Sequence, residues 1–166
     1  PTPPHLFFNQ PATTYSNTLS LHDALPICGY APFDGAEYDY YTTAKGILEK
    51  VRAHAGDVDF EVQPELLSLL SSGDFGRYAD EKGEMNVCFI SNNDITGGNS
   101  GSAMFNAKGE LLGLAFDGNW EAMSSDILYE PKMQRTIGVD VRYILFMIEK
   151  YGKAGNLIQE LKLANP

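Results

Sequence analysis

The sequence predicts a mainly β domain that ends in helices. Short apolar runs bounded by glycine and polar turn residues, such as Val87–Ser91 and Glu110–Phe116, are typical of strands. After Asp140, apolar residues at 141, 144, 145 and 148 have helical spacing and indicate a closing helix. The chain has 166 residues, of which 43% are apolar and 20% charged, so a single domain with a substantial core is expected.

Residues 1–27 are rich in Pro, Thr and Ser and show no periodicity. Within them, Thr18–Ile27 resembles the in-frame translation of a common short-read sequencing adapter. We therefore interpret residues 1–27 as a sequencing scar, exclude them from the fold and expect no packed structure there. The alternative is a natural disordered tail. On either interpretation, the folded part is expected to be residues 28–166.

The first half of residues 28–166 contains one candidate strand and two helical segments. Glu37–Thr43 is dense in aromatic residues, which favours packing on a sheet over a binding platform. Thr43–Ala53 is a short turn or helix. Pro64 can begin a second helix, and Gly73 can end it. Asp74–Asp80 has the composition of a polar loop with embedded aromatic residues.

The second half has clearer signals. Val87–Ser91 is a candidate buried strand, and Ala103–Phe105 and Glu110–Phe116 form a hairpin whose turn uses Gly109 at positive φ. Arg135–Val139 is a further short strand.

Two helices are expected at the C-terminal end. Asp140 is a typical N-cap for a helix that runs to about Tyr151 and stops at Gly152. A last short amphipathic helix covers Leu157–Leu163.

The charge balance excludes some partners. The chain has 12 Lys and Arg against 22 Asp and Glu, a formal charge of −10, which argues against nucleic acid and anionic membrane surfaces. No apolar run has the length of a membrane span. Cys28 and Cys88 are too few for a disulfide framework, and the carboxylates are scattered. We therefore expect no metal and no organic cofactor.

One glycine-rich stretch carries candidate chemistry: Ile95-Thr96-Gly97-Gly98-Asn99-Ser100-Gly101-Ser102. A serine between glycines, placed between two apolar runs, is how chymotrypsin-like proteases present their nucleophile. The N–H groups of Gly98 and Ser100 can then converge on one oxyanion. A glycine-rich hairpin loop without catalysis is the alternative.

The longer string around Ser100 resembles the nucleophile region of the S46 family of serine dipeptidyl peptidases. The resemblance rests on Ser91–Ser102 and on Glu110–Met123, and it extends to Asp74–Asp80 and Gln134–Tyr143. It covers residues 29–163. It implies that this chain is the second β-barrel half of a chymotrypsin-like double-barrel serine protease, which carries an inserted helical domain.

The resemblance also implies what the whole enzyme does. It removes dipeptides from free peptide N-termini, without a cofactor, in the periplasm or at the cell surface of a Gram-negative bacterium. The intact enzyme is then expected to be a homodimer.

Four residues are assigned roles by this resemblance. Ser100 is the nucleophile, and Gly98 with Ser100 forms the oxyanion hole. Asp117 binds the α-ammonium group of the substrate, for which a carboxylate at the edge of a site is suited. Gly118 leaves room for an apolar residue before the cut, as in the dipeptidyl peptidase 7 branch, whereas an arginine there selects Asp or Glu, as in the dipeptidyl peptidase 11 branch. The alternatives are that Asp117 is a solvated loop aspartate and that Gly118 is a turn glycine.

Asp94 lies six residues before Ser100, where trypsin-type enzymes read Lys or Arg. The S46 family carries an aspartate here without that specificity, so we favour a structural role.

A catalytic triad also needs a histidine and a carboxylate. His22 and Asp23 lie in the adapter-like stretch with His5 nearby, and His54 lies in a candidate exposed loop. The resemblance places the catalytic His and Asp in an N-terminal barrel that is missing here, so we expect this chain alone to be inactive and to expose apolar surface. The alternative is a non-catalytic β-barrel binding module. The gene sequence upstream of residue 28 distinguishes this module from a truncated S46 peptidase.

Overall fold

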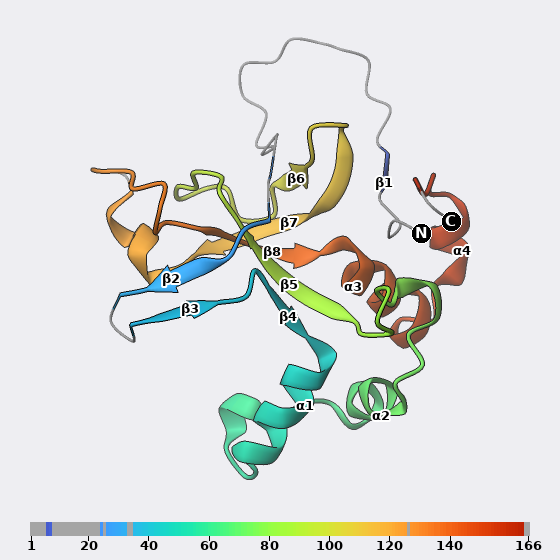
Figure 1. Cartoon of the computed structure of the whole chain (residues 1–166). Helices are drawn as coiled ribbons and strands as arrows, with labels where there is room; N and C mark the ends of the chain where they lie inside the picture. Colours follow the sequence, from blue (N-terminus) through green and yellow to red (C-terminus); the bar gives the residue numbers. More distant parts are fainter. Residues whose placement is uncertain (1–5, 8–23, 25, 33–34, 126, 165–166) are drawn as a thin grey trace.

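The structure is a computed structural model that describes residues 6–7, 24, 26–32, 35–125 and 127–164 (Figure 1). The described residues exclude His5, His22, Asp23 and most of the adapter-like stretch. The adapter interpretation therefore stays a prediction.

The described strands form an open antiparallel sheet of six strands, ordered β1-β7-β8-β5-β4, with β6 also paired to β7. The strands are β1 (Leu6–Phe7), β4 (Tyr41–Thr43), β5 (Asn86–Ser91), β6 (Ala103–Phe105), β7 (Glu110–Gly118) and β8 (Thr136–Asp140). In the described part of the chain, β4 does not pair back to β1 or β6, so the sheet does not close into a barrel. The mainly β class with C-terminal helices is confirmed.

The expected strand Glu37–Thr43 is wrong as one element, because the chain forms two strands there. β2 (Gly29–Ala31) and β3 (Ala36–Tyr38) form a separate hairpin, while β4 joins the main sheet beside β5. The two strands belong to different sheets because their pairing partners differ. Tyr38 pairs with Gly29 of β2, whereas two residues later the Tyr40 carbonyl accepts from the Ile90 N–H of β5 at 2.8 Å.

The packed chain starts before Cys28. The Ala24 N–H donates to the Phe105 carbonyl at 2.9 Å, and the Ala24 side chain is 5% exposed in a cluster with Phe89 and Met104. Pro26 also bridges to Ser91 at the end of β5. The expectation of no packed structure up to residue 27 is therefore wrong for these residues, because backbone pairing extends to the segment that leads into β2.

Most of the helices flank the sheet at one end, whereas the short 3-10 turn that follows β7 lies at the other end (Figure 1). The helices are α1 (Ala44–Ala53), α2 (Pro64–Ser72), α3 (Val141–Phe146), the π-helical η4 (Met147–Tyr151), α4 (Gly155–Gln159) and the 3-10 turns η1 (Val58–Phe60), η2 (Gly76–Tyr78) and η3 (Trp120–Ser124). Their ends match the sequence signals: Thr43 Oγ1 accepts from the Gly46 N–H, Pro64 opens α2, and Gly73 ends it at φ +67°. None of the described helices is long and apolar enough to cross a membrane.

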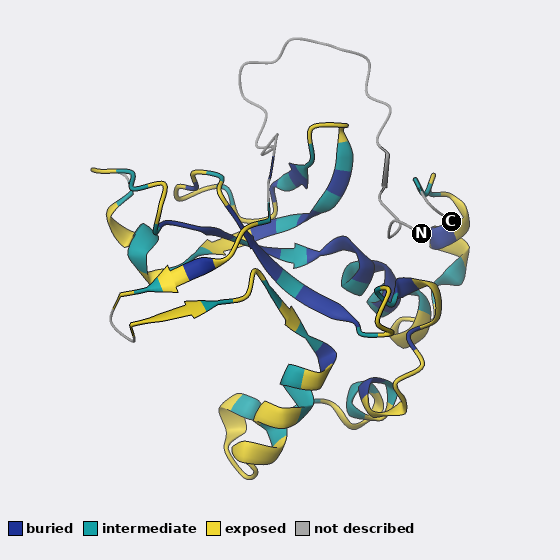
Figure 2. Cartoon of the chain, viewed as in Figure 1, coloured by how far each residue is buried: buried dark blue, intermediate teal, exposed yellow. Residues whose placement is uncertain are grey.

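The larger core lies between the sheet and these helices (Figure 2). Tyr78 and Phe146 are fully buried there, and their rings pack edge to face with centroids 6.2 Å apart. Phe75 packs against Phe146 in the same way. Asp74–Asp80, expected as a polar loop with embedded aromatic residues, contains the 3-10 turn η2, and its aromatic residues reach back into the core.

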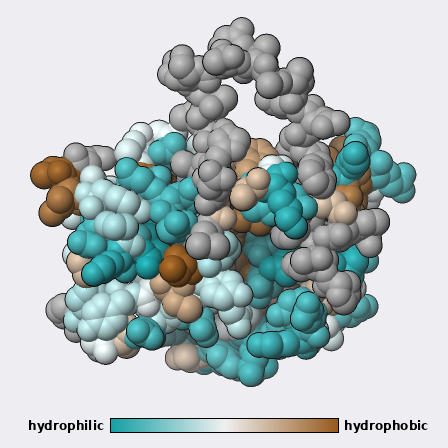
Figure 3. Space-filling model, turned by 45° about the horizontal axis from the view of Figure 1, so that its top comes forward, coloured by the Kyte–Doolittle hydropathy of each residue, from teal (hydrophilic) through white to brown (hydrophobic). Residues whose placement is uncertain are grey.

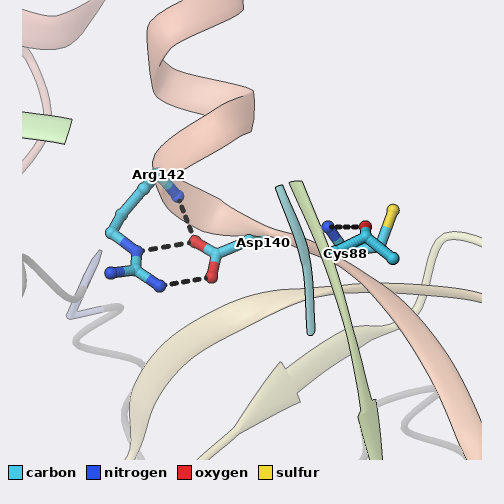
Figure 4. Close-up of polar contacts among 4 residues, drawn as sticks. Cys88, Asp140 and Arg142 are labelled. Atoms are coloured by element: carbon cyan, nitrogen blue, oxygen red, sulfur yellow. Dashed lines mark hydrogen bonds and ion pairs between the residues drawn. The ribbon is translucent and has the colours of Figure 1, made fainter. Parts of the chain in front are cut away.

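Asp140 fixes the junction between β8 and α3 (Figure 4). Its Oδ1 accepts from the Arg142 N–H at 2.8 Å, which confirms the predicted N-cap. Both carboxylate oxygens also bind the Arg142 guanidinium, at 2.9 and 2.7 Å, and both side chains are largely buried. Nearby on β5, burial and the charge of Asp140 raise the pKa of the Cys88 thiol, although the hydrogen bond to Thr42 opposes this.

Candidate active site

The Ser100 loop connects β5 to β6 and is held on β7. The Gly101 N–H donates to the Ala115 carbonyl at 2.7 Å, and the Ala115 N–H donates to the Ser102 carbonyl at 2.8 Å. Gly98 and Gly101 have φ values of +102° and +84°, a region that favours glycine. The glycines on both sides of the serine are therefore required by the turn.

Asn99 holds the loop together from inside. Its Oδ1 accepts from the Thr96 N–H at 3.0 Å, and its carbonyl accepts from the Ser102 N–H at 2.9 Å. Within the described residues, the N–H groups of Gly98 and Ser100 have no hydrogen-bond acceptor. Two unpaired N–H groups, one of the serine itself and one two residues before it, are what an oxyanion hole needs.

The Ser100 side chain is exposed and lies beside β7. Its Oγ is 3.5 Å from the Phe116 carbonyl, at the outer limit for a hydrogen bond. Phe116 is the extra residue of a β-bulge, because Ala115 pairs with Gly138 and Asp117 already pairs with Ile137. The bulge turns the Phe116 carbonyl toward the serine, a feature that the sequence reading missed.

Asp117 and Gly118 complete β7 directly after this bulge. Asp117 is exposed, and its Oδ1 accepts from the Gly118 N–H at 2.8 Å. A Cβ atom at Gly118 would lie 2.9 Å from the Ala122 Cβ and 3.4 Å from the Ile95 Cγ2. The structure therefore brings the strand end with Asp117 and Gly118 to the same side of the sheet as the loop of Ser100, with small and apolar neighbours around Gly118.

Asn119 and Arg135 support this strand end, and the sequence reading assigned neither of them to the site. The Asn119 N–H donates to the Arg135 carbonyl at 2.9 Å, and the Arg135 N–H donates to Asn119 Oδ1 at 2.8 Å. Arg135 is buried. The available sequence signal was an asparagine directly after a strand and an arginine directly before one.

Tyr129 contacts the segment between β5 and the Ser100 loop, close to Asp94. The Tyr129 hydroxyl donates to the Asn92 carbonyl at 2.7 Å. Burial and the nearby Asp94 carboxylate raise the pKa of Tyr129, and Arg135 opposes this. Asp94 itself is exposed.

His54 directly follows α1, which begins beside the start of β5, whereas the loop of Ser100 follows the end of β5 (Figure 1). It is exposed, caps α1 and stacks on Phe60 with ring centroids 4.1 Å apart. No other histidine lies in the described part of the chain. The described residues thus bring a serine and free N–H groups together, but no base. Nor do they contain a cluster of three or more His, Cys, Asp or Glu side chains that could hold a metal ion.

Comparison with known proteins settles the family. The sequence profile described as Peptidase S46 matches residues 24–163. The chain belongs to the Peptidase S46 family. The start of this match at residue 24 agrees with the packing of Ala24 onto the sheet.

Individual members of the S46 family are similar to this chain. It is 61% identical over 137 residues to dipeptidyl-peptidase 7 of Porphyromonas endodontalis, and 58% identical to that of Porphyromonas gingivalis. It is 43% identical over 136 residues to the Asp/Glu-specific dipeptidyl-peptidase of P. endodontalis. These matches cover 82% of this chain and 16%, 19% and 19% of the relatives, so the chain spans less than a fifth of their length.

A solved S46 structure has the same fold. The crystal structure of P. endodontalis DPP11 in complex with the dipeptide Arg-Asp matches with a TM-score of 0.75 at 42% identity, over 81% of this chain and 19% of that one. This likeness supports the arrangement of strands and C-terminal helices described above.

Proposed function

We propose that this chain is the nucleophile-bearing part of a serine dipeptidyl peptidase. The observation that carries the proposal is the Ser100 loop. It presents an exposed hydroxyl and two unpaired N–H groups beside the β7 bulge, in a chain of the S46 family. The whole enzyme would release dipeptides from the free N-termini of peptides.

The proposed reaction is acyl transfer through Ser100. Its Oγ attacks the carbonyl carbon of the second substrate residue, and its proton passes to a histidine from the part of the enzyme outside this chain. The oxyanion accepts hydrogen bonds from Gly98 and Ser100 N–H. The C–N bond then breaks, the amine leaves with the histidine's proton, and water hydrolyses the acyl ester to free the dipeptide and the serine.

Asp117 is proposed to bind the substrate's α-ammonium group. Its carboxylate is exposed on the strand end beside Ser100, and the Gly118 N–H restrains Oδ1. A carboxylate at this position selects substrates with a charged, free N-terminus. It therefore limits the released product to a short N-terminal peptide.

Gly118 is proposed to admit an apolar residue before the cut. Its neighbours Ile95 and Ala122 are apolar. The higher identity to dipeptidyl-peptidase 7 than to the Asp/Glu-specific enzyme of the same organism also favours this, at 61% against 43%.

The rest of the enzyme is proposed to supply the catalytic His and Asp from a first barrel, so that this sheet forms part of a chymotrypsin-like double barrel. The homodimer and the periplasmic or cell-surface location are proposed from the family resemblance alone. Cell fractionation with an antibody against residues 24–163 tests the location.

A chimaeric enzyme tests the function. Residues 24–163 replace the matching segment of the P. endodontalis dipeptidyl-peptidase 7, and fluorogenic dipeptides with free or acylated N-termini report turnover. We expect turnover of free N-termini that Ser100→Ala abolishes, with Asn106→Ala as a control outside the site. A folded chimaera without turnover would contradict the proposal.

A further inference from the structure

Asn119, the residue directly after β7, connects the strand end to three other parts of the chain. Its side-chain amide shares two N–H groups among three acceptors: Glu121 Oε2 at 2.8 Å, the Met133 carbonyl at 2.8 Å and the Tyr38 hydroxyl at 3.1 Å. Its Oδ1 accepts from the Arg135 N–H at 2.8 Å. All of its side-chain hydrogen-bonding groups are therefore used, which is the pattern of a side chain that holds others in place.

Arg135 gives this connection a fixed support. It is buried, and its guanidinium donates to backbone carbonyls of Cys28, Pro131, Lys132 and Gln134 at 2.7–3.2 Å. The guanidinium thus ties the segment before β8 to the start of the β2–β3 hairpin. Because Tyr38 ends that hairpin, Asn119 and Arg135 both attach the hairpin to the end of β7.

Between the bulge and this anchor lie only two residues, Asp117 and Gly118. The bulge at Phe116 leaves one position of the β7–β8 ladder unpaired, so pairing at the strand end is weakened there. The backbone exchange between Asn119 and Arg135 resumes the connection on the far side. The location of the two residues proposed to bind substrate thus depends on a bulge on one side and on Asn119 on the other.

We propose that Asn119 is a positioning residue that fixes Asp117 and Gly118 where the substrate's N-terminal ammonium group and second side chain bind. This inference rests on the proposed function. Asn119 does not contact substrate, and its loss should weaken substrate binding rather than the chemical step at Ser100.

The kinetic test uses the chimaeric enzyme with Asn119→Ala. Because small misplacements of binding groups are costly, kcat/KM should fall on the order of 10- to 100-fold, mostly through KM. The matched control is Asn106→Ala at the opposite end of β7, where Asn106 binds Glu110 Oε2 at 2.6 Å and accepts from the Lys108 and Glu110 N–H groups. Asn106→Ala should leave KM within about twofold of the unmutated chimaera.

A double-mutant cycle separates positioning from general destabilisation. If Asn119 acts through Asp117, the effect of Asn119→Ala on KM should largely vanish in an Asp117→Ala background. The effect of Asn106→Ala should be the same in both backgrounds. Full additivity of Asn119→Ala with Asp117→Ala would overturn the inference.

Hydrogen exchange on the same chimaera gives a readout without activity. Asn119→Ala should speed amide exchange at Gly118 and at Thr136, its partner on β8, and leave exchange in β5 unchanged. Should Asn119→Ala prevent folding, Tyr38→Phe removes a single acceptor, and it should raise KM about two- to fivefold. Unchanged amide exchange at Gly118 in Asn119→Ala would overturn the inference. If exchange at Gly118 and Thr136 is faster as expected but the unmutated chimaera is inactive, only the proposed function is contradicted.

Discussion

At the scale of single residues, Ser102 stands out beside the proposed nucleophile. Its side chain is 4% exposed, and its Oγ has no hydrogen-bond partner within the described residues. Ser91 is a buried serine of the opposite kind, because its Oγ donates to Asn93 Oδ1 at 2.8 Å. A buried hydroxyl without a partner carries a desolvation cost that nothing offsets.

These two serines form a matched pair for a stability test. We expect Ser102→Ala to raise the free energy of unfolding of this chain by about 1 kcal/mol, and Ser91→Ala to lower it by about 1 kcal/mol. Chemical denaturation at low protein concentration measures both changes. Equal destabilisation by the two substitutions would show that the Ser102 hydroxyl has a partner.

Tyr78 and Glu149 link η2 to η4 within the larger core. The Tyr78 hydroxyl donates to Glu149 Oε2, and this lowers the pKa of Glu149 from its usual 4.5, with further help from the Arg77 guanidinium at 2.9 Å. Burial, together with Glu149, raises the pKa of Tyr78 to about 12, so the hydroxyl stays a donor at neutral pH.

The pH dependence follows from the lowered pKa of Glu149. Its contribution to stability is fully present above the unfolded pKa of about 4.5 and is lost as the pH falls through the folded value. Tyr78→Phe should therefore cost about 1 kcal/mol or more at neutral pH, and the difference from the unmutated chain should shrink as the pH falls below the unfolded pKa of Glu149 and through its lowered folded value. Tyr143→Phe is the control, because the Tyr143 hydroxyl makes no hydrogen bond within the described residues. A Tyr78→Phe deficit that is constant with pH would contradict this account.

At the scale of elements, the start of α3 depends on one carboxylate. Asp140 both caps the helix and neutralises the buried Arg142. Asp140→Ala leaves a buried guanidinium unpaired, so we expect a loss of about 3–5 kcal/mol, against about 1 kcal/mol for Thr43→Ala at the cap of α1. Thermal and chemical denaturation compare the two. Similar losses for both variants would mean that Arg142 finds another partner.

The elements that local chemistry decides were predictable from the sequence. The ends of α2 follow from Pro64 and Gly73, and the β6–β7 turn follows from Gly109, which has φ +74°. The Ser100 loop was also predictable, because its glycines and its string of neighbours are local.

Features that depend on distant segments were not predictable from local patterns. The split of Glu37–Thr43 depends on which strand each half pairs with, and the burial of Tyr78 depends on Phe146 and Glu149 far along the chain. The β7 bulge needs the register of β8, and the role of Asn119 needs partners at positions 38, 121, 133 and 135. A single sequence carries no signal for such pairings.

At the scale of the whole molecule, an apolar segment after β7 is uncovered. Trp120 is 79% exposed and Ile127 is 93% exposed, and Met123 and Leu128 are also exposed. Strongly hydrophobic residues are visible at the left margin in Figure 3, on the side where Figure 1 places the segment after η3. Because the chain spans less than a fifth of its relatives' length, we propose that the rest of the enzyme covers this segment.

This proposal predicts self-association of the isolated chain. Replacing Ile127 and Leu128 together by serine should reduce self-association and dye binding to apolar surface, whereas Val58→Ser, at an equally exposed site on η1, should change them little. Sedimentation velocity over a concentration series measures the effect. A monomeric unmutated chain at all concentrations would contradict the proposal.

We propose that Ser100 is the nucleophile of an S46 dipeptidyl peptidase and needs the rest of the enzyme to act. The most direct measurement is dipeptide release from peptides with free N-termini by the chimaera, by its Ser100→Ala variant and by the 166-residue chain alone. We expect turnover by the unmutated chimaera only. Turnover by the Ser100→Ala chimaera, or by the 166-residue chain alone, would contradict it.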